Sequence, residues 1–439
     1  MNNSRATFNT RIGFVLAAAG SAIGLGNIWG FPTNAANNGG GAFVFVYLIV
    51  TVLLALPALY AEIYLGNQNQ KNPVSALGDA CQETSRKLGR AAGKFGLIGA
   101  LTMLSFYTIV AGWMLANALS PLAKILGFEI LATWFSQDSL LRNLIFTPIF
   151  ILLGALIIHQ GVNKGIEKWS TRLMPLLLML LISLITYILQ QPGAIAGLKH
   201  YLIPDFNQVL EPKLIISAMG QAFFSLSLGV GGMMIYGSYM PKGKNIGKLV
   251  LSIATLDTLI AILAGLLIIP ALYVAQHAGQ DVFVEGKLIG EGQLIFQVLP
   301  TLFNSMGEVG AWLAVIFFSL LSIAALTSTI SSTEVPVAYL VEDKGLSRNK
   351  ATWCVSALVL TASMTLVAFF DVLFGLVIQI LTTIIQPLSC LFYFIVVGWL
   401  WKKGNKLKGQ SKHLTYLGYY LGSVCPILLT IVFINLAFS

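Results

Sequence analysis

The chain has 439 residues, of which 56% are hydrophobic and only 10% are charged. Soluble domains carry about 25% charged residues, so the composition excludes a soluble globular protein and indicates an integral membrane protein. The formal net charge of +9 does not indicate a nucleic-acid partner, because the basic residues gather on one side of the predicted membrane spans.

We predict an all-α protein in which residues 1–439 form a single transmembrane domain, because no long polar linker divides the chain. About eleven spans are predicted, at roughly 12–35, 41–68, 92–121, 143–160, 166–190, 213–240, 246–274, 307–340, 350–370, 373–401 and 415–438. With the amino terminus in the cytoplasm, most of the 26 Lys and Arg residues fall on the cytoplasmic side, as the positive-inside rule requires. An odd number of spans then places the carboxyl terminus outside, and the polar segment Met1–Arg11 predicts no cleavable signal peptide.

The first span is interrupted between Gly20 and Phe31 by four glycines, a serine and an asparagine. Glycine weakens a helix, and uncovered backbone is tolerated in a bilayer only where protein or a watery cavity surrounds it. Two interpretations follow from this stretch alone. It is either a broken helix whose carbonyls and amides hold an ion or a small charged ligand, or a helix with close-packing glycines.

Span 6 repeats the pattern in Gly220–Gly232, which is also rich in glycine and serine. Spans 1 and 6 are the first members of two five-span halves, and broken helices at corresponding positions indicate an inverted repeat with a binding site at the midplane. We therefore predict helices 1 and 6 broken at the midplane. The first repeat is expected at about 10–190, the second at about 213–401, and an extra helix at about 415–438.

Three acidic residues fall inside predicted spans, namely Glu62, Asp257 and Glu334. A charged group is costly at this depth and needs a partner. Asp257 is either a cation ligand or charge compensator, or a neutral carboxylic acid hydrogen-bonded between helices. We expect Glu62 to brace the unwound backbone of a neighbouring helix and Glu334 to belong to a polar network.

Span 8 is rich in hydroxyl groups between Ser322 and Thr333. The adjacent Thr327 and Ser328 either bond back to their own helix or bind a small cation together with backbone carbonyls. In span 3, Tyr107 is either a core tyrosine or a hydroxyl that reaches the carboxylate of a ligand.

Taken together, these motifs resemble the neurotransmitter:sodium symporter family, specifically its bacterial amino-acid transporter branch with the leucine-transporter (LeuT) fold. The resemblance covers nearly the whole chain and rests on Gly20–Pro32, Gly39–Phe43, Gly220–Gly229 and Ala325–Ser328. It implies a symporter that imports a neutral, hydrophobic or aromatic L-amino acid by alternating access, coupled to sodium at two sites and without a chloride requirement. The alternatives are a proton-coupled amino-acid transporter and a substrate-sensing receptor on the same fold.

The resemblance also implies a multi-pass protein of the bacterial inner (cell) membrane that is not an enzyme and has the lipid bilayer and an amino acid as partners. The implied second sodium site consists of the carbonyls of Gly20, Ile23 and Ala324 with the hydroxyls of Thr327 and Ser328. The implied first site consists of the Ala22 carbonyl, Asn27, Ser225, Asp257 and the substrate carboxylate. Because the ion and the substrate share that carboxylate, each would favour binding of the other.

The resemblance to the family also implies a substrate site. The carboxylate would meet the amides of Leu25 and Gly26 and the hydroxyl of Tyr107. The ammonium would meet carbonyls near Ala22, Phe224 and Ser225, and Ser227. The side chain would lie among Met103, Val110, Phe224, Ser227, Val230, Ser328 and Ser332. Gly24 leaves room for an α-carboxylate where relatives that carry monoamines have an aspartate.

Two gates are implied as well. The cytoplasmic gate would pair Arg5 with Glu342 or Asp343, with Tyr239 nearby. Gly165 and Pro175 match a spacing that the family associates with local unwinding of span 5. At the outer gate the family usually has an arginine where this chain has Gly30, and an aspartate where it has Phe374. We therefore expect apolar and aromatic packing of Tyr107, Phe224 and Phe374 to close this gate.

Overall fold

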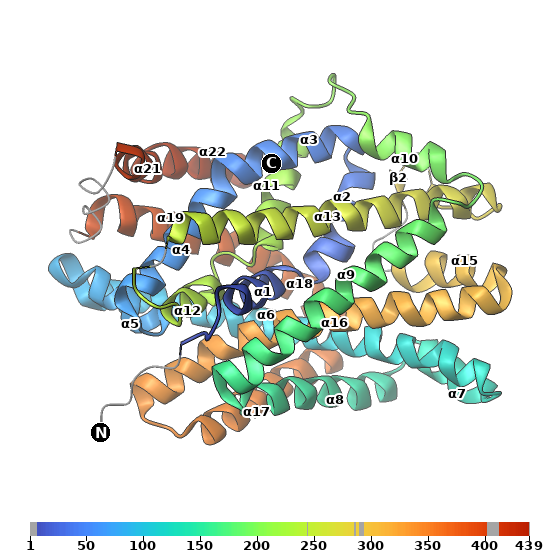
Figure 1. The fold of residues 1–439 in the computed structure, drawn as a ribbon, viewed down its shortest axis with the longest axis horizontal. Coiled ribbons are helices and arrows are strands. Elements are labelled where there is room, and N and C mark those ends of the chain that lie inside the picture. The colour runs from blue at the N-terminus through green and yellow to red at the C-terminus, as the bar shows by residue number, and fades with distance from the viewer. Residues whose placement is uncertain (1–6, 244, 285–286, 289–293, 402–411, 439) are drawn as a thin grey trace.

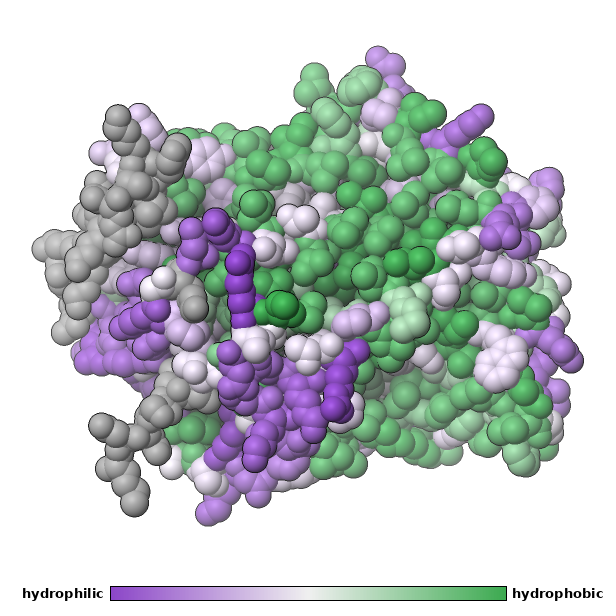
Figure 2. Space-filling model, viewed as in Figure 1, coloured by the Kyte–Doolittle hydropathy of each residue, from purple (hydrophilic) through white to green (hydrophobic). Residues whose placement is uncertain are grey.

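The computed structural model describes residues 7–438 except for 244, 285–286, 289–293 and 402–411. Its long helices form a bundle in which α13 (Ile246–His277) and α16 (Gly307–Lys344) run along the long axis of the molecule (Figure 1). Hydrophobic side chains cover a broad area of the visible surface, and hydrophilic ones gather mainly toward its ends (Figure 2). This distribution is the one expected of a bundle surrounded by lipid.

Eight helical segments in the described part of the chain are long and apolar enough to cross a membrane. They are Gly41–Asn69, Ser85–Ile125, Leu140–Ile158, Val162–Ile188, Ile246–His277, Gly307–Lys344, Arg348–Ala368 and Phe370–Leu400. A ninth is the bent pair of α1 (Arg11–Ala22) and Gly26–Asn37, whose axes differ by 56°. These segments confirm the predicted all-α membrane class.

The other two predicted spans are helical but divided into shorter pieces. Span 6 consists of α11 (Pro212–Ser225) and α12 (Gly232–Ser238), and the last span consists of α21 (Lys412–Gly422) and α22 (Val424–Phe438). Neither pair reaches the length and hydropathy of the other nine as one helix.

The remaining elements complete these spans or lie between them. Within the spans are η1 (Gly26–Gly30), α2 (Phe31–Asn37), α3 (Gly41–Val50), η2 (Thr51–Ala55), α4 (Leu56–Asn69), α6 (Gln82–Ile125), α8 (Leu140–Ile158), η3 (Val162–Glu167), α9 (Lys168–Ile188), α17 (Arg348–Ala368), α18 (Phe370–Gln379), η5 (Ile380–Ile385), α19 (Gln386–Ile395) and η6 (Val396–Leu400). Between spans lie α5 (Pro73–Ala80), α7 (Glu129–Ser136), α10 (Ala194–Leu202), η4 (Leu294–Val298), α15 (Leu299–Ser305) and the antiparallel pair β1 (Phe283–Val284) and β2 (Lys287–Leu288). The sequence did not predict the two strands.

The first interruption has a clear local cause. Thr10 begins α1 by accepting the Gly13 amide at 2.8 Å, and the helix ends after Ala22, where Ile23 adopts an extended backbone with ψ 102°. The helical path resumes at Gly26. Residues between the two helices do not follow the regular hydrogen-bond ladder, so their backbone groups face the interior of the bundle.

The second interruption covers residues 226–231 and needs backbone conformations that most residues avoid. Ser227, Gly229 and Gly231 have φ values of +50°, +84° and +81°. A Cβ at Gly229 would lie 2.4 Å from the Gln386 carbonyl oxygen, so only glycine fits this close approach. Glu62 is fully buried, and its Oε2 accepts the Gly229 amide at 3.4 Å. That contact agrees with the predicted bracing of the unwound backbone.

Candidate functional site

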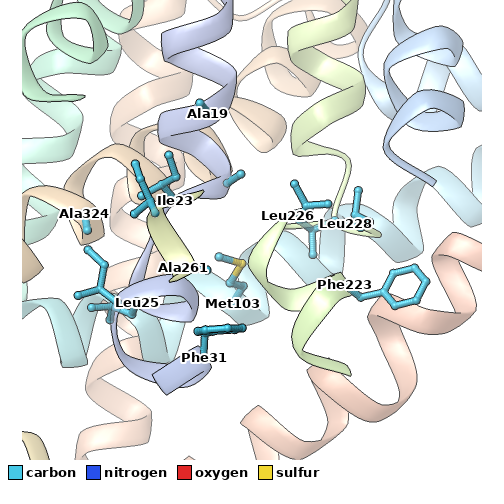
Figure 3. Close-up of a cluster of buried hydrophobic side chains, with 14 of the residues drawn as sticks. Ala19, Ile23, Leu25, Phe31, Met103, Phe223, Leu226, Leu228, Ala261 and Ala324 are labelled. Carbon is cyan, nitrogen blue, oxygen red and sulfur yellow. The ribbon is translucent and has the colours of Figure 1, made fainter. Parts of the chain in front are cut away.

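The two interruptions lie on either side of Met103, a residue of α6 (Figure 3). Leu25 and Phe31 belong to the first interrupted span, whereas Leu226 and Leu228 belong to the second. All of these side chains are buried. The two breaks therefore face a common, largely apolar centre of the molecule.

A fully buried polar cluster joins the first break to α11 and α13. The Asn27 amide donates to Asp257 Oδ1 at 2.7 Å and to Ser225 Oγ at 2.8 Å. Ser225 Oγ in turn donates to Asp257 Oδ2 at 2.8 Å. Each of the three residues has an exposed fraction of 0%. A carboxylate and a hydroxyl at a helix break are oxygen donors that suit a sodium ion.

Tyr47 adds a fourth side chain to this cluster that the sequence analysis missed. Its hydroxyl donates to Ser225 Oγ at 3.4 Å, and its side chain is fully buried. The side-chain oxygen of Asn27 contacts the break itself, because Asn27 Oδ1 accepts the Gly24 amide at 3.2 Å. The cluster therefore ties the position of the broken backbone to the charge of Asp257.

A second cluster lies where α16 meets the end of α1. Ser328 Oγ reaches the carbonyl oxygens of Ser21 at 3.2 Å and Ile23 at 3.3 Å. Ser227 Oγ donates to the same Ser21 carbonyl at 3.2 Å. The resemblance had pointed to the carbonyls of Gly20 and Ile23, so the Ser21 carbonyl is an addition. Gly20 and Ala22 lie buried in the last turns of α1, and Ala324 lies buried in α16.

Several other hydroxyls of α16 bond back to their own helix, which was one of the two interpretations of this hydroxyl-rich stretch. Thr327 Oγ1 bonds to the Ala324 carbonyl at 3.0 Å, and Thr329 and Thr333 likewise bond to carbonyls of their own helix. Only part of the hydroxyl-rich stretch therefore faces another segment. Ser328 contacts carbonyls of the broken span, and Ser331 contacts that span by accepting from Ser21 Oγ at 2.6 Å.

The amide side of the first break is closely packed. The Leu25 amide donates to Tyr107 Oη at 3.0 Å. A Cβ at Gly24 would lie 2.5 Å from both Tyr107 Oη and Ser328 Oγ, and a Cβ at Gly26 would lie 2.9 Å from the Phe224 ring. Both glycines are therefore required by space, and a side chain at position 24 would displace two hydroxyl groups.

The predicted side-chain pocket lies next to these groups. Ser332 Oγ is 4.0 Å from the Met103 sulfur, and both residues are buried. Val230 is fully buried in the second interruption. Val110 and Phe224 instead line a larger cavity on the other side of the break. The predicted pocket residues are thus divided between the Met103–Ser332 contact and this cavity.

That larger cavity has a volume of about 350 Å³ and extends from the amide side of the first break toward α18. Its described lining consists of Leu25, Trp29, Gly30, Asn34, Phe106, Tyr107, Val110, Ser217, Gly220, Gln221, Phe224, Phe374, Ile378 and Thr382. No acidic or basic residue is among them. The rings of Phe374 and Phe370 stack with centroids 4.5 Å apart, and Trp113 lies 5.7 Å from Phe374.

Gln221 is the main residue of this cavity that the sequence analysis missed. Its Nε2 donates to the Gly26 carbonyl at 2.7 Å, and its Oε1 accepts from Asn34 Nδ2 at 3.2 Å. A Cβ at Gly30 would lie 3.3 Å from Gln221 Oε1. Neutral amide groups therefore connect the two interrupted spans near Gly30, where the sequence lacks the arginine that usually forms the ion pair of the outer gate. The sequence signal that could have identified Gln221 is its position as a polar residue inside an apolar span.

At the opposite end of the bundle, Glu334 is completely buried and forms an ion pair with Arg348. Arg348 Nη1 and Nη2 contact the two carboxylate oxygens of Glu334 at 3.0 and 2.6 Å, and its Nε donates to the Ile158 carbonyl at 2.9 Å. Tyr239 Oη also donates to Glu334, at 2.5 Å. Tyr239 is therefore held by a network that includes Arg348, which the predicted gate did not contain.

The predicted gate residues Glu342 and Asp343 lie about two helical turns beyond Glu334 in α16. Arg5 lies outside the described residues. Asp343 forms an ion pair with Arg90 at 2.5 Å, and Glu342 accepts the Asn72 amide at 2.7 Å. These contacts fasten the end of α16 to the start of α5.

The predicted unwinding in span 5 coincides with a wide helical turn. Gly165 lies in η3, and Pro175 lies inside α9. Glu167, also in η3, accepts the Asn9 amide at 3.0 Å and the Thr10 amide at 3.2 Å. The start of α1 is therefore attached to the irregular part of span 5.

Two interrupted helices whose breaks meet at a buried polar cluster define a class of membrane transporter with its binding site inside the bundle. The model of the Sodium:neurotransmitter symporter family matches residues 5–145 and 143–438. The chain belongs to this family, and as a member it is a sodium-dependent symporter of the membrane.

Individual relatives agree with this assignment. The chain is 33% identical to an uncharacterized sodium-dependent transporter, YhdH, of Bacillus subtilis, over 97% of this chain and 96% of that protein. It is 25% identical to the sodium-dependent serotonin transporter of Drosophila melanogaster, over 77% of this chain and 60% of that protein. The crystal structure of MhsT in complex with L-phenylalanine matches with a TM-score of 0.84 and 33% identity, and covers 98% of this chain and 99% of that chain.

Proposed function

We propose that this protein imports a neutral, hydrophobic or aromatic L-amino acid together with sodium, by alternating access. The observation that carries the proposal is the meeting of both helix breaks at the cluster of Asn27, Ser225 and Asp257. The similarity to MhsT, whose structure was solved with L-phenylalanine, supports an aromatic amino acid as one substrate.

Two sodium ions fit the donor groups. The first would be held by Asn27, Ser225, Asp257 and the Ala22 carbonyl, and would share the carboxylate of the substrate. The second would be held by Ser328 and Thr327 with carbonyls of α1 and of Ala324. The contact of Ser328 with the Ile23 carbonyl supports this second assignment.

The substrate carboxylate would occupy the amide side of the first break. Leu25 and Gly26 supply backbone amides there, and Tyr107 supplies a hydroxyl 3.0 Å from the Leu25 amide. Gly24 keeps this place free, because any larger residue would meet Tyr107 and Ser328. The ammonium would lie at the carbonyl side, near Ala22.

The side chain of the substrate would lie among Met103, Val110, Phe224, Ser227, Val230, Ser328 and Ser332. These groups carry no charge, and their polar groups are three serine hydroxyls, so they favour a side chain without charge. The absence of a charged residue from the described lining of the adjoining 350 Å³ cavity supports the same class.

We propose that transport needs no chloride, because the Asp257 carboxylate supplies a permanent negative charge beside the first sodium. We further propose that the outer gate closes through Tyr107, Phe224 and Phe374. Gln221 would then hold the two interrupted spans together in place of an ion pair.

For the orientation, we propose a bacterial inner membrane with the amino terminus in the cytoplasm and the carboxyl terminus outside, as the distribution of Lys and Arg requires. Residues of about 10–190 and 213–401 would form the two inverted repeats of a single domain. The cytoplasmic gate would then lie at Tyr239, Glu342 and Asp343.

The test is uptake of radiolabelled amino acids into proteoliposomes that contain the purified full-length protein. An inward sodium gradient is expected to drive uptake, and competition by each of the twenty amino acids would identify the preferred side chain. Uptake driven by a proton gradient without sodium would overturn the coupling ion. Sodium-dependent binding without any uptake would instead indicate a sensor.

A further inference from the structure

We propose that the end of the bundle near the start of α1 holds an anionic phospholipid, with its headgroup in a basic cavity and an acyl chain along α13. The headgroup cavity has a volume of about 420 Å³. It is lined by Phe8, Asn9, Thr10, Arg11, Phe14, Met240, Pro241, Asn245, Lys248 and Leu249. This site is separate from the proposed sodium and substrate sites and does not depend on which amino acid is transported.

The charged residues among the described lining of the cavity are all positive. Arg11 and Lys248 carry positive charge, and no acidic residue is among the described lining residues. Neither side chain takes part in an ion pair within the described part of the chain. Glu167 of η3 accepts the Asn9 and Thr10 amides and is not among the residues that line the cavity.

Two helices begin at this cavity. α13 adds to its positive potential, whereas the start of α1 already faces the Glu167 carboxylate, which accepts the Asn9 and Thr10 amides. α1 begins at Arg11 after the cap Thr10, and α13 begins at Ile246 after the cap Asn245. The amino-terminal ends of helices carry partial positive charge and unpaired amides. With the two basic side chains, the start of α13 favours an anionic headgroup over a zwitterionic or neutral one.

The floor and rim of the cavity suit a lipid rather than a free anion. Phe8, Phe14 and Leu249 form a buried apolar floor, whereas Ile12 is 70% exposed beside Arg11. In the view shared by Figures 1 and 2, hydrophilic surface around the start of α1 borders directly on hydrophobic surface. A molecule bound here would therefore reach both water and hydrocarbon.

A second, almost wholly apolar groove of about 340 Å³ continues along α13. From Lys248, steps of three or four residues lead to Leu251, Thr255, Thr258 and Ile262, which all line this groove. From Lys248 to Ile262 the helix rises about 21 Å, which exceeds half of the hydrocarbon thickness of about 30 Å. One acyl chain can therefore follow α13 while its headgroup stays at Lys248.

The experiment measures the thermal unfolding midpoint of the full-length protein in detergent micelles as phosphatidylglycerol is added. Phosphatidylcholine with the same acyl chains tests the role of charge, and glycerol phosphate tests the headgroup alone. We expect saturable stabilisation by phosphatidylglycerol and little by the other two. Equal stabilisation by phosphatidylcholine, or by glycerol phosphate, would overturn an anionic lipid as the occupant.

Variants then locate the site. Arg11→Gln and Lys248→Gln are each expected to weaken apparent phosphatidylglycerol binding about fivefold, because one basic residue near a lipid surface contributes that much. Lys242→Gln is the matched control, since Lys242 is exposed in the same region but does not line the cavity. Arg11→Lys keeps the charge and should bind as the wild type does. If the two glutamine variants bind like Lys242→Gln, the cavity is not the site.

Discussion

Replacing Asp257 by asparagine tests the first sodium site directly, because the change keeps the shape of the side chain and removes its charge. Asp257 accepts hydrogen bonds from Asn27 at 2.7 Å and from Ser225 at 2.8 Å in a fully buried cluster. A hydrogen bond to a charged group contributes about 1.5–3 kcal/mol. Losing one such interaction with the ion should raise the sodium concentration for half-saturation roughly tenfold to a hundredfold.

The assay is equilibrium binding of the transported amino acid as sodium is varied at fixed pH and constant ionic strength. Asp371→Asn is a matched control, because it makes the same chemical change at an exposed position of α18. Adding chloride to the Asp257→Asn protein separates the two roles left open for this residue. Recovery with chloride would show a charge compensator, whereas no recovery would indicate a sodium ligand. An unchanged sodium dependence of the variant would refute both roles.

Three further predictions concern the break and the two ends of the bundle. Gly24→Ala should weaken substrate binding about fivefold to a hundredfold, because overpacking costs about 1–3 kcal/mol; wild-type affinity in an equilibrium binding assay would contradict the role of space at this position. Gly30→Arg should slow uptake roughly tenfold, since it places an unpaired charge against Gln221 and an unsatisfied buried group costs about 1–3 kcal/mol; faster uptake would contradict the neutral outer gate. Arg348→Gln should lower the unfolding midpoint by leaving Glu334 buried without its ion pair, a loss of about 3–5 kcal/mol, and adding Glu334→Gln should restore part of it; a single variant as stable as the wild type would refute this reasoning.

The sequence predicted the interrupted spans well because their causes are local. Glycines at positions 20, 24 and 26 weaken the first helix, and Gly229 and Gly231 supply the left-handed backbone of the second. These glycines weaken a helix through their own backbone, so their effect does not depend on tertiary contacts. The end of α1 at Ala22 and the resumption at Gly26 follow directly from that composition.

The residues that the sequence missed are partners across the bundle. Gln221 contacts the Gly26 carbonyl, and Arg348 contacts Glu334 and the Ile158 carbonyl, all through tertiary packing. A single sequence shows that a buried acid needs a partner but does not identify it. The hydroxyl-rich part of α16 was ambiguous for the same reason, because the direction of each hydroxyl depends on its neighbours.

The two ends of the bundle are stabilised by different physical interactions. At one end, the Glu334–Arg348 and Asp343–Arg90 ion pairs join α16 to neighbouring segments. At the other, neutral amides of Gln221 and aromatic rings surround the cavity. Breaking a buried ion pair costs more than breaking a neutral hydrogen bond. Opening the end with the ion pairs therefore requires each charge to find water or a new partner, whereas opening the other end requires only that neutral groups be rehydrated.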